Sequence, residues 1–242
     1  MALMATGGYG RGQMAPYSDI DLMFLLPYKL TPNSEQVVEF ILYTLWDLGL
    51  KVGHATRSVD EALWLAKNDL NTRTSMLDAR CLFGNQTLSR VFKNRFLKEI
   101  VQVTGPAFVE AKLTERDERH TRMGDTRYVL EPNLKEGKGG LRDLQTLFWI
   151  AKYLYQVESA LGLKDAKVLT AGDVRIFTKV ENFLWTVRCN LHYLAGRPEE
   201  RLTFNVQEEL GKRMGYRNQA ATRGDERFMK HYYLTAKAIG DL

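Results

Sequence analysis

Asp19 and Asp21 stand at the start of an apolar run, one position apart, and together could hold divalent metal ions. Side chains of a β-strand alternate between its two faces. A strand beginning at Asp19 therefore presents both carboxylates on one side, with their Cα atoms about 6–7 Å apart, while Ile20 enters the core. Magnesium is usually held by one or two carboxylates together with substrate phosphates. Two such ions activate an attacking hydroxyl and stabilise a leaving group, which suits phosphoryl transfer.

A glycine-rich stretch precedes this acidic pair. Gly7 and Gly8 lack Cβ atoms, so the backbone can turn sharply there and approach a triphosphate closely. A short helix just beyond them would direct its first N–H groups at phosphate oxygens, and Arg11 could add a charge-assisted contact. The glycine spacing also fits a P-loop, but Gln13 and Met14 replace the lysine and the hydroxyl residue of that motif. Asp-x-Asp or a glycine turn alone is a common surface feature; in this order, between two apolar runs, they favour a metal-dependent nucleotide site.

The elements that must position these residues follow from the hydrophobic pattern. Strands are predicted over residues 2–6, 20–26 and 50–57, and helices over 33–48, 60–67 and 71–81. Asn33 is expected to cap the first of these helices, with Gln36 three residues on.

From about residue 105 onward the pattern is helical. Apolar residues recur at spacings of three and four from Phe177 to Leu194, ending at Gly196, and another helix is predicted over 227–239. The sequence therefore predicts an α+β fold, with an α/β domain over residues 1–104 and an all-helical domain over 105–242.

Composition excludes several classes of protein. Hydrophobic residues make up 45% and charged residues 26%, which is typical of globular chains, and no apolar run is long enough for a transmembrane helix. Cys81 and Cys189 form no C-x-x-C motif, so neither a disulfide framework nor a zinc ribbon is indicated and a reducing cytoplasm is expected. The net charge of +5 is spread along the chain, so neither a nucleic-acid nor a membrane partner is expected.

Several stretches resemble the DNA polymerase beta-type nucleotidyltransferase superfamily, and within it the bacterial PII-protein uridylyltransferases. The first stretch contains Gly-Gly-Tyr-Gly-Arg-Gly and then Pro-Tyr-Ser-Asp-Ile-Asp-Leu. A later one contains Glu-Pro-Asn-Leu-Lys-Glu-Gly-Lys-Gly-Gly-Leu-Arg-Asp. The similar stretches span nearly the whole chain: 7–22, 45–54, 128–145, 201–204 and 226–233.

This resemblance implies a nucleotidyltransferase domain with a mixed sheet over 1–104. A helical domain shared by PII uridylyltransferases and glutamine synthetase adenylyltransferases would follow over 105–242. The implied nucleotide contacts are Gly7, Gly8, Arg11 and Ser18. The implied catalytic metal ligands are Asp19 and Asp21, binding Mg²⁺ or Mn²⁺.

A third carboxylate usually completes the site in this superfamily. The third predicted strand offers none, because it reads Val-Gly-His over 52–54. Asp78 is a weak candidate, and a surface ion pair with Arg73 or Arg80 fits that residue equally well. In the helical half, Lys135, Lys138 and Arg142 either contact phosphates or belong to a loop that starts a helix.

The function implied is transfer of a uridylyl group from UTP to a tyrosine of the PII nitrogen-signalling protein, with release of pyrophosphate. The alternatives are adenylyl transfer to glutamine synthetase and a non-catalytic module that binds nucleotide or protein. Family members are much longer and begin further upstream, so the chain is expected to be a fragment that lacks an N-terminal segment and the hydrolase and regulatory domains.

Overall fold

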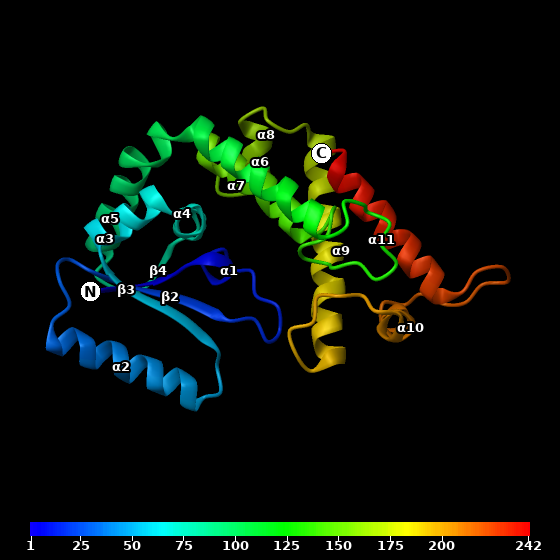
Figure 1. The fold of residues 1–242 in the computed structure, drawn as a ribbon, viewed down its shortest axis with the longest axis horizontal. Helices are drawn as coiled ribbons and strands as arrows, with labels where there is room; N and C mark the ends of the chain where they lie inside the picture. Colours follow the sequence, from blue (N-terminus) through cyan, green and yellow to red (C-terminus); the bar gives the residue numbers. More distant parts are fainter. The chain divides into compact units, whose positions relative to one another are not determined.

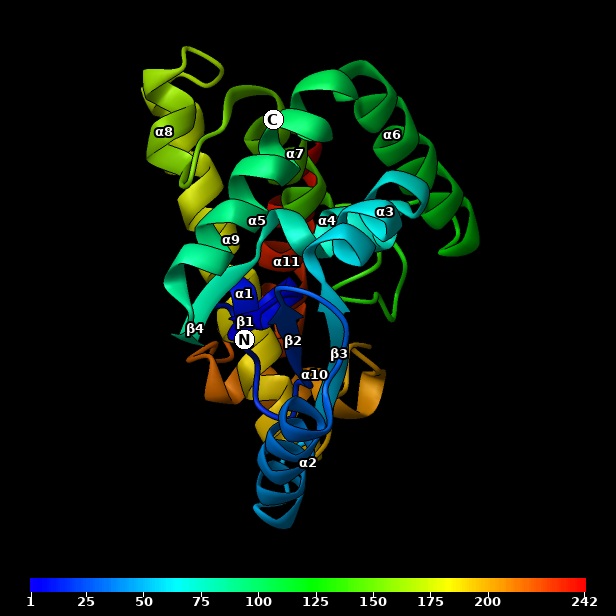
Figure 2. The same cartoon turned by 90° about the vertical axis from the view of Figure 1, so that its left-hand side faces the viewer.

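Four strands form one mixed sheet in the order β3-β2-β1-β4. Their bounds are β1 Ala2–Ala5, β2 Ile20–Leu26, β3 Val52–Ser58 and β4 Arg80–Gly84. The central strand β1 runs antiparallel to β2 and to β4, whereas β2 and β3 are parallel. Strands β3 and β4 therefore form the two edges of the sheet (Figure 2). The prediction of an α+β fold with a mixed sheet is confirmed.

The computed structural model describes all 242 residues, which divide into two compact units, residues 1–108 and 109–242 (Figure 1). The sequence predicted a boundary after residue 104. The helices of the first unit are α1 Gly7–Gly10, α2 Pro32–Asp47, α3 Val59–Asn68, α4 Leu70–Leu77 and α5 Gln86–Glu99, followed by the 3-10 turn η1 Val101–Val103.

Helix α2 covers one face of the sheet. Leu22 and Phe24 of β2 pack there against Val38 and Leu42 of α2, and Ile20 is partly buried at the edge of the same cluster. Even-numbered residues of β2 thus face α2. Since side chains alternate along a strand, Asp21 belongs to the opposite face.

Two local predictions are wrong. Helix α2 begins after Thr31, whose hydroxyl accepts a hydrogen bond from the backbone N–H of Ser34, so Thr31 and not Asn33 is its cap. Pro32 favours this start because its fixed φ suits the first helical position. The helix predicted over 71–81 stops at Leu77, and Arg80 already begins β4. Residues 80–84 pair with the free edge of β1, a partner distant in sequence that local periodicity does not reveal.

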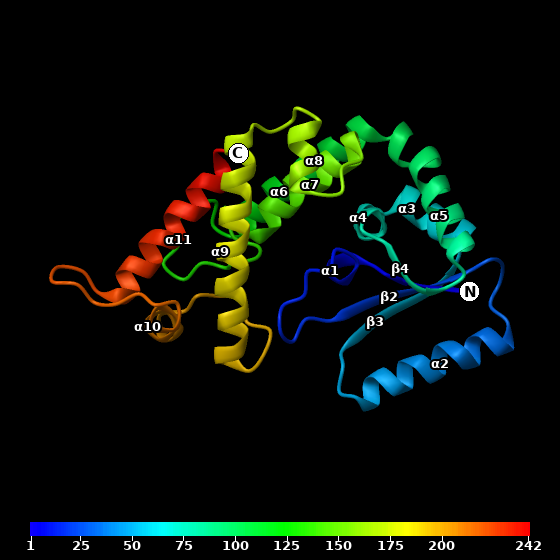
Figure 3. The ribbon, with the colours of Figure 1, turned by 180° about the vertical axis from the view of Figure 1, so that it is seen from behind.

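The second unit is helical, as predicted. Its helices are α6 Gly105–Arg122, which begins before the boundary, α7 Leu141–Tyr155, α8 Ala160–Asp165, α9 Ala171–Ala195, α10 Phe204–Arg213 and α11 Gly224–Gly240. The predicted stripe of α9 is buried with Leu144 of α7 and Phe228 of α11 in one core cluster. Helix α9 is the longest and has α10 and α11 as neighbours (Figure 3). None of the helices has both the length and the apolar character needed to span a membrane.

Candidate functional site

Asp21 lies near the start of β2, and its carboxylate fills the space beside two glycines. A Cβ atom added to Gly7 would lie 2.9 Å from Oδ2 of Asp21, and one added to Gly53 would lie 2.9 Å from Oδ1. Gly53 is the register partner of Asp21 on the parallel strand β3. The carboxylate is thus held between the turn after β1 and the neighbouring strand, where any larger residue would displace it.

The turn after β1 has the geometry expected of a glycine turn. Gly7 has φ +54°, a conformation that glycine adopts without steric cost, and it begins the single helical turn α1. The backbone N–H of Thr6, the residue before it, donates to the carbonyl of Asp21 at 3.0 Å. No side chain caps α1. The first N–H groups of a helix have no partner within it, so Gly7 and Gly8 offer backbone donors beside the Asp21 carboxylate.

Asp19 and Ser18 lie in the turn that leads into β2. Tyr17 adopts φ +64°, and the N–H of Ser18 donates to the carbonyl of Ala15 at 3.1 Å. Asp19 is exposed, whereas Asp21 is half-buried. The strand itself spans Ile20–Leu26, as the hydrophobic pattern predicts, so Asp19 is the residue immediately before the strand.

Asp78, the candidate for a third catalytic acid, is buried in an ion pair and is not an open metal ligand. It is 3% exposed and lies at the end of α4, where its Oδ2 atom is 2.6 Å from Nη1 of Arg11. The alternative of a surface pair with Arg73 or Arg80 is wrong, because the residue is buried and its partner is Arg11. The pair fixes the guanidinium of Arg11 beside the backbone of Gly8, within 3.8 Å of a Cβ added there.

Arg80 is a site residue that the sequence analysis missed. From the first position of β4 it donates hydrogen bonds to the carbonyls of Gly10, at 3.2 Å, and Tyr9, at 3.1 Å. It therefore holds the end of α1. The sequence predicts a helix over residues 71–81, and in a helix Asp78 and Arg80 have no reason to reach the glycine turn.

Asp19 and Asp21 remain the two candidate metal ligands of this site. No group of three or more His, Cys, Asp and Glu side chains in the structure has a metal-binding arrangement. Asp19 and Asp21 supply hard oxygen donors of the kind that Mg²⁺ prefers, and Mg²⁺ keeps its remaining positions for water and phosphate oxygens. The donor set therefore fits a magnesium ion shared with a nucleotide, and it does not fit a metal held by protein ligands alone.

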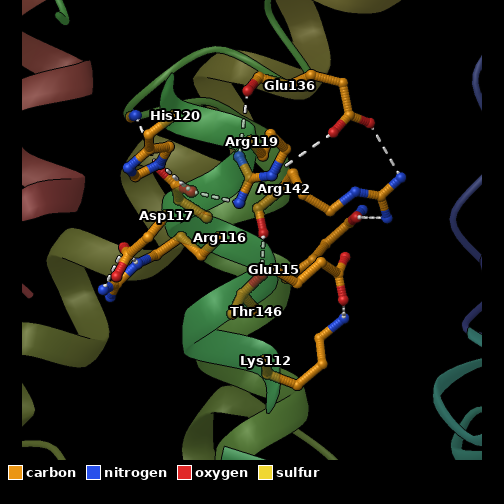
Figure 4. Close-up of polar contacts among 12 residues, drawn as sticks. Lys112, Glu115, Arg116, Asp117, Arg119, His120, Glu136, Arg142 and Thr146 are labelled. Carbon is orange, nitrogen blue, oxygen red and sulfur yellow. Dashed lines mark hydrogen bonds and ion pairs between the residues drawn. The ribbon is translucent and has the colours of Figure 1, made fainter. Parts of the chain in front are cut away.

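The glycine-rich stretch of the helical unit is fastened by Asp143. Its carboxylate accepts from Nη2 of Arg119 at 2.8 Å and from the N–H of Gly139 at 2.7 Å, and Nε2 of His120 lies 2.9 and 3.0 Å from its two oxygens. Arg119 also donates to the carbonyl of Glu136 at 3.1 Å (Figure 4). These contacts tie the loop before α7 to α6.

The cations of this stretch differ in their partners. Nη2 of Arg142 is 3.1 Å from Oε1 of Glu136, and Nζ of Lys138 is 2.7 Å from Oδ1 of Asp125. The pKa of Lys135 lies below its ordinary value, because burial disfavours its charge and Arg142 adds like charge nearby. Arg142 and Lys138 thus form ion pairs within this part of the helical unit, which agrees with the alternative that they stabilise the loop. Their contact with phosphate stays a prediction.

Comparison with known proteins gives a consistent result. Residues 107–242 match the family described as GlnD PII-uridylyltransferase, and residues 2–74 match the family described as nucleotidyltransferase domain. The chain is 62% identical over 240 residues, 99% of its length, to the bifunctional uridylyltransferase/uridylyl-removing enzyme of Azospirillum brasilense. It is 61% identical over all 242 residues to the protein of that name from Rhodospirillum rubrum, and 57% identical to one from Bradyrhizobium sp. strain ORS 278. The chain spans 26% of the length of these relatives.

Proposed function

Since the chain belongs to the PII-uridylyltransferase family, we propose that it transfers a uridylyl group from UTP to a tyrosine hydroxyl of the PII signalling protein. The observation that carries this proposal is the placement of the Asp21 carboxylate between Gly7 and Gly53, directly beside the glycine turn. A carboxylate beside a glycine turn suits a Mg²⁺ ion that is shared with the phosphates of a substrate.

In this proposal Asp19 and Asp21 hold Mg²⁺, with Mn²⁺ as a substitute. The bound metal supplies neutralisation of the triphosphate charge and activation of the attacking oxygen. The backbone donors of Gly7 and Gly8 bind phosphate oxygens, and Arg11 adds a charge-assisted contact on the same side. Ser18 is proposed to contact the nucleotide from the turn before β2.

Asp78 is proposed as a positioning residue and no longer as a catalytic acid. Its carboxylate is already committed to Arg11 at 2.6 Å and is buried. By fixing the guanidinium next to Gly8, it removes the conformational cost of ordering a long arginine side chain when the triphosphate arrives.

The attacking tyrosine oxygen would approach the α-phosphorus in line, and pyrophosphate would leave from the opposite side. The protein's part is to hold the triphosphate in that geometry, because positioning and charge neutralisation account for most of the catalysis in this type of reaction. A reducing cytoplasm is the proposed setting, with which the free thiols of Cys81 and Cys189 agree.

A second candidate function is binding of the nucleotide without turnover. It is favoured by the residue beside Asp21 on β3, which is Gly53, so that strand contributes no acid at this position. Adenylyl transfer to glutamine synthetase is the third candidate, suggested by the helical domain that the two enzyme types share.

Intact-mass measurement separates these candidates. The chain is incubated with Mg²⁺ and each of the four nucleoside triphosphates, in one series with PII protein and in another with glutamine synthetase. We expect one uridylyl addition to PII, only with UTP and only with Mg²⁺. Adenylylated glutamine synthetase would establish the third candidate. Saturable UTP binding without any modified protein would establish the second.

A further inference from the structure

The helical unit contains a small cavity that the proposed function does not use. Its volume is about 130 Å³, and its wall includes the end of α6, the loop that follows it, Arg201 and Tyr232 of α11. All of its lining residues lie between positions 122 and 232, within the second unit.

The charge of this lining is strongly unbalanced. Four cationic side chains contribute to it, and Glu131 is the only acid. Glu131 already accepts a hydrogen bond from the backbone N–H of Phe204 at 2.8 Å. The cationic residues are Arg122, Arg127, Lys138 and Arg201.

Only one of these cations is neutralised by a carboxylate. Lys138 pairs with Asp125, outside the cavity lining, at 2.7 Å. The guanidinium groups of the three arginines form no ion pair within the protein. Excess positive charge on a concave surface of this size attracts a small anion.

Arg127 provides the most specific signal. Its Nε atom is buried and has no hydrogen-bond partner. A Cβ atom at Gly240 of α11 would overlap its guanidinium, so the side chain occupies room that only a glycine leaves. A buried charged donor without an acceptor is costly, and a ligand oxygen in the cavity would remove that cost. Tyr232, a polar residue only 1% exposed, adds a hydroxyl-bearing side chain to the same wall.

We propose that this cavity binds a single phosphate group, with Arg127 as its main donor and Arg122 and Arg201 as flanking charges. The planar fork of an arginine matches the oxygen spacing of a phosphate. A water molecule occupies about 30 Å³, so 130 Å³ holds a tetrahedral oxyanion. It is smaller than the roughly 300 Å³ at which pockets begin to enclose whole drug-sized ligands, so a nucleotide can enter only by its phosphate.

The test is calorimetric titration of the whole chain with inorganic phosphate, and separately with UMP, against sodium chloride at matched ionic strength. Arg127→Gln removes the central donor. Arg116→Gln is the matched control, because Arg116 also lies on the helical unit but is only half-buried, is paired with Asp117 and does not line the cavity. Phosphate should bind saturably to the parent chain and to Arg116→Gln, and about tenfold or more weakly to Arg127→Gln.

Two further measurements separate phosphate binding in this cavity from a structural effect and from binding at the first unit. Arg127→Gln should unfold at the same temperature as the parent chain without phosphate, or at a higher one, because it removes an unpaired buried donor; a clear loss would mean that the arginine is structural. Asp21→Asn should leave phosphate binding unchanged, which separates this cavity from the site in the first unit. Tight binding of UMP would identify a nucleotide phosphate as the ligand, and binding of phosphate alone a free anion. Binding no stronger than that of chloride, or equal binding to Arg127→Gln, would overturn the proposal.

Discussion

At the scale of single residues, the two units use carboxylates in opposite ways. Asp21 lies beside Gly7 and Gly53, and a Cβ atom added to either glycine would lie 2.9 Å from one of its carboxylate oxygens. Asp143 instead accepts from a guanidinium and a backbone N–H and faces an imidazole. The donors around Asp143 fasten its loop, whereas Gly7 and Gly53 leave the Asp21 carboxylate the space that larger side chains would fill. We therefore expect the chemistry to lie in the first unit and the glycine-rich stretch of the second unit to be structural.

The structural role of Asp143 predicts a large loss of stability in Asp143→Ala. Arg119 and His120 would both lose the Asp143 carboxylate while remaining largely buried, and removing one partner of a buried charged network costs about 3 kcal/mol or more. Urea unfolding measures the change. Asp117→Ala is the control, because Asp117 lies on the same helix with its side chain 65% exposed. Similar losses in the two variants would contradict this role.

His231 predicts a pH dependence of stability. Its pKa lies below the ordinary value, because burial disfavours the charged ring and Lys179 adds like charge. The unfolded chain therefore binds a proton more readily, so the free energy of unfolding should fall as pH drops through about 6.5 and level off below the folded pKa. In His231→Gln this decrease should be smaller. Parallel stability curves from pH 7.5 to 5 for the two proteins would show that His231 is not the titrating group.

At the scale of elements, the parallel pairing of β2 with β3 decides what stands beside Asp21. The sequence showed that the third strand brings no acid, but it did not show that Gly53 is the register partner of Asp21. Register depends on the partner strand, which no local pattern contains. Gly53 therefore leaves space for the Asp21 carboxylate, in addition to supplying no metal ligand of its own.

This register predicts the effect of Gly53→Ala. The added methyl group would stand 2.9 Å from Oδ1 of Asp21, so the carboxylate must move. A shift of this kind should lower the rate of nucleotidyl transfer about tenfold to a hundredfold, while the melting temperature changes little. Gly172→Ala in α9 is the control, since its added Cβ meets only an ordinary contact at 3.4 Å. An unchanged rate in Gly53→Ala would show that Asp21 is not placed as described.

Periodic elements were the most predictable part of the chain. The apolar run of β2 and the apolar stripe of α9 can be recognised in the sequence, because each consists of buried residues at regular spacing. Strand β4 did not, because its five residues form an edge and one of its larger apolar side chains, Phe83, is 80% exposed. Because the prediction extended a helix into β4, it also misplaced Asp78 and Arg80. Their contacts with the glycine turn depend on where α4 ends.

At the scale of the whole molecule, the family match and the two units agree in outline. The nucleotidyltransferase match covers residues 2–74 and the PII-uridylyltransferase match residues 107–242, while the structure divides after residue 108. Residues 75–106 lie outside both matches, yet they contain Asp78 and Arg80, which hold the glycine turn. The first unit must therefore extend beyond residue 74 to complete the proposed nucleotide site.

The central claim is that Asp19 and Asp21 support metal-dependent nucleotidyl transfer. Its most direct test is the rate of pyrophosphate release from UTP with PII protein, measured against Mg²⁺ concentration for the parent chain, Asp19→Asn and Asp21→Asn. Asp47→Asn, an exposed acid at the end of α2, is the control. Outer-shell partners of metal ligands are worth about tenfold to a hundredfold, so loss of a direct ligand should lower the rate by more than about a hundredfold. Parental rates in both variants, or release that does not require a divalent metal, would contradict the account.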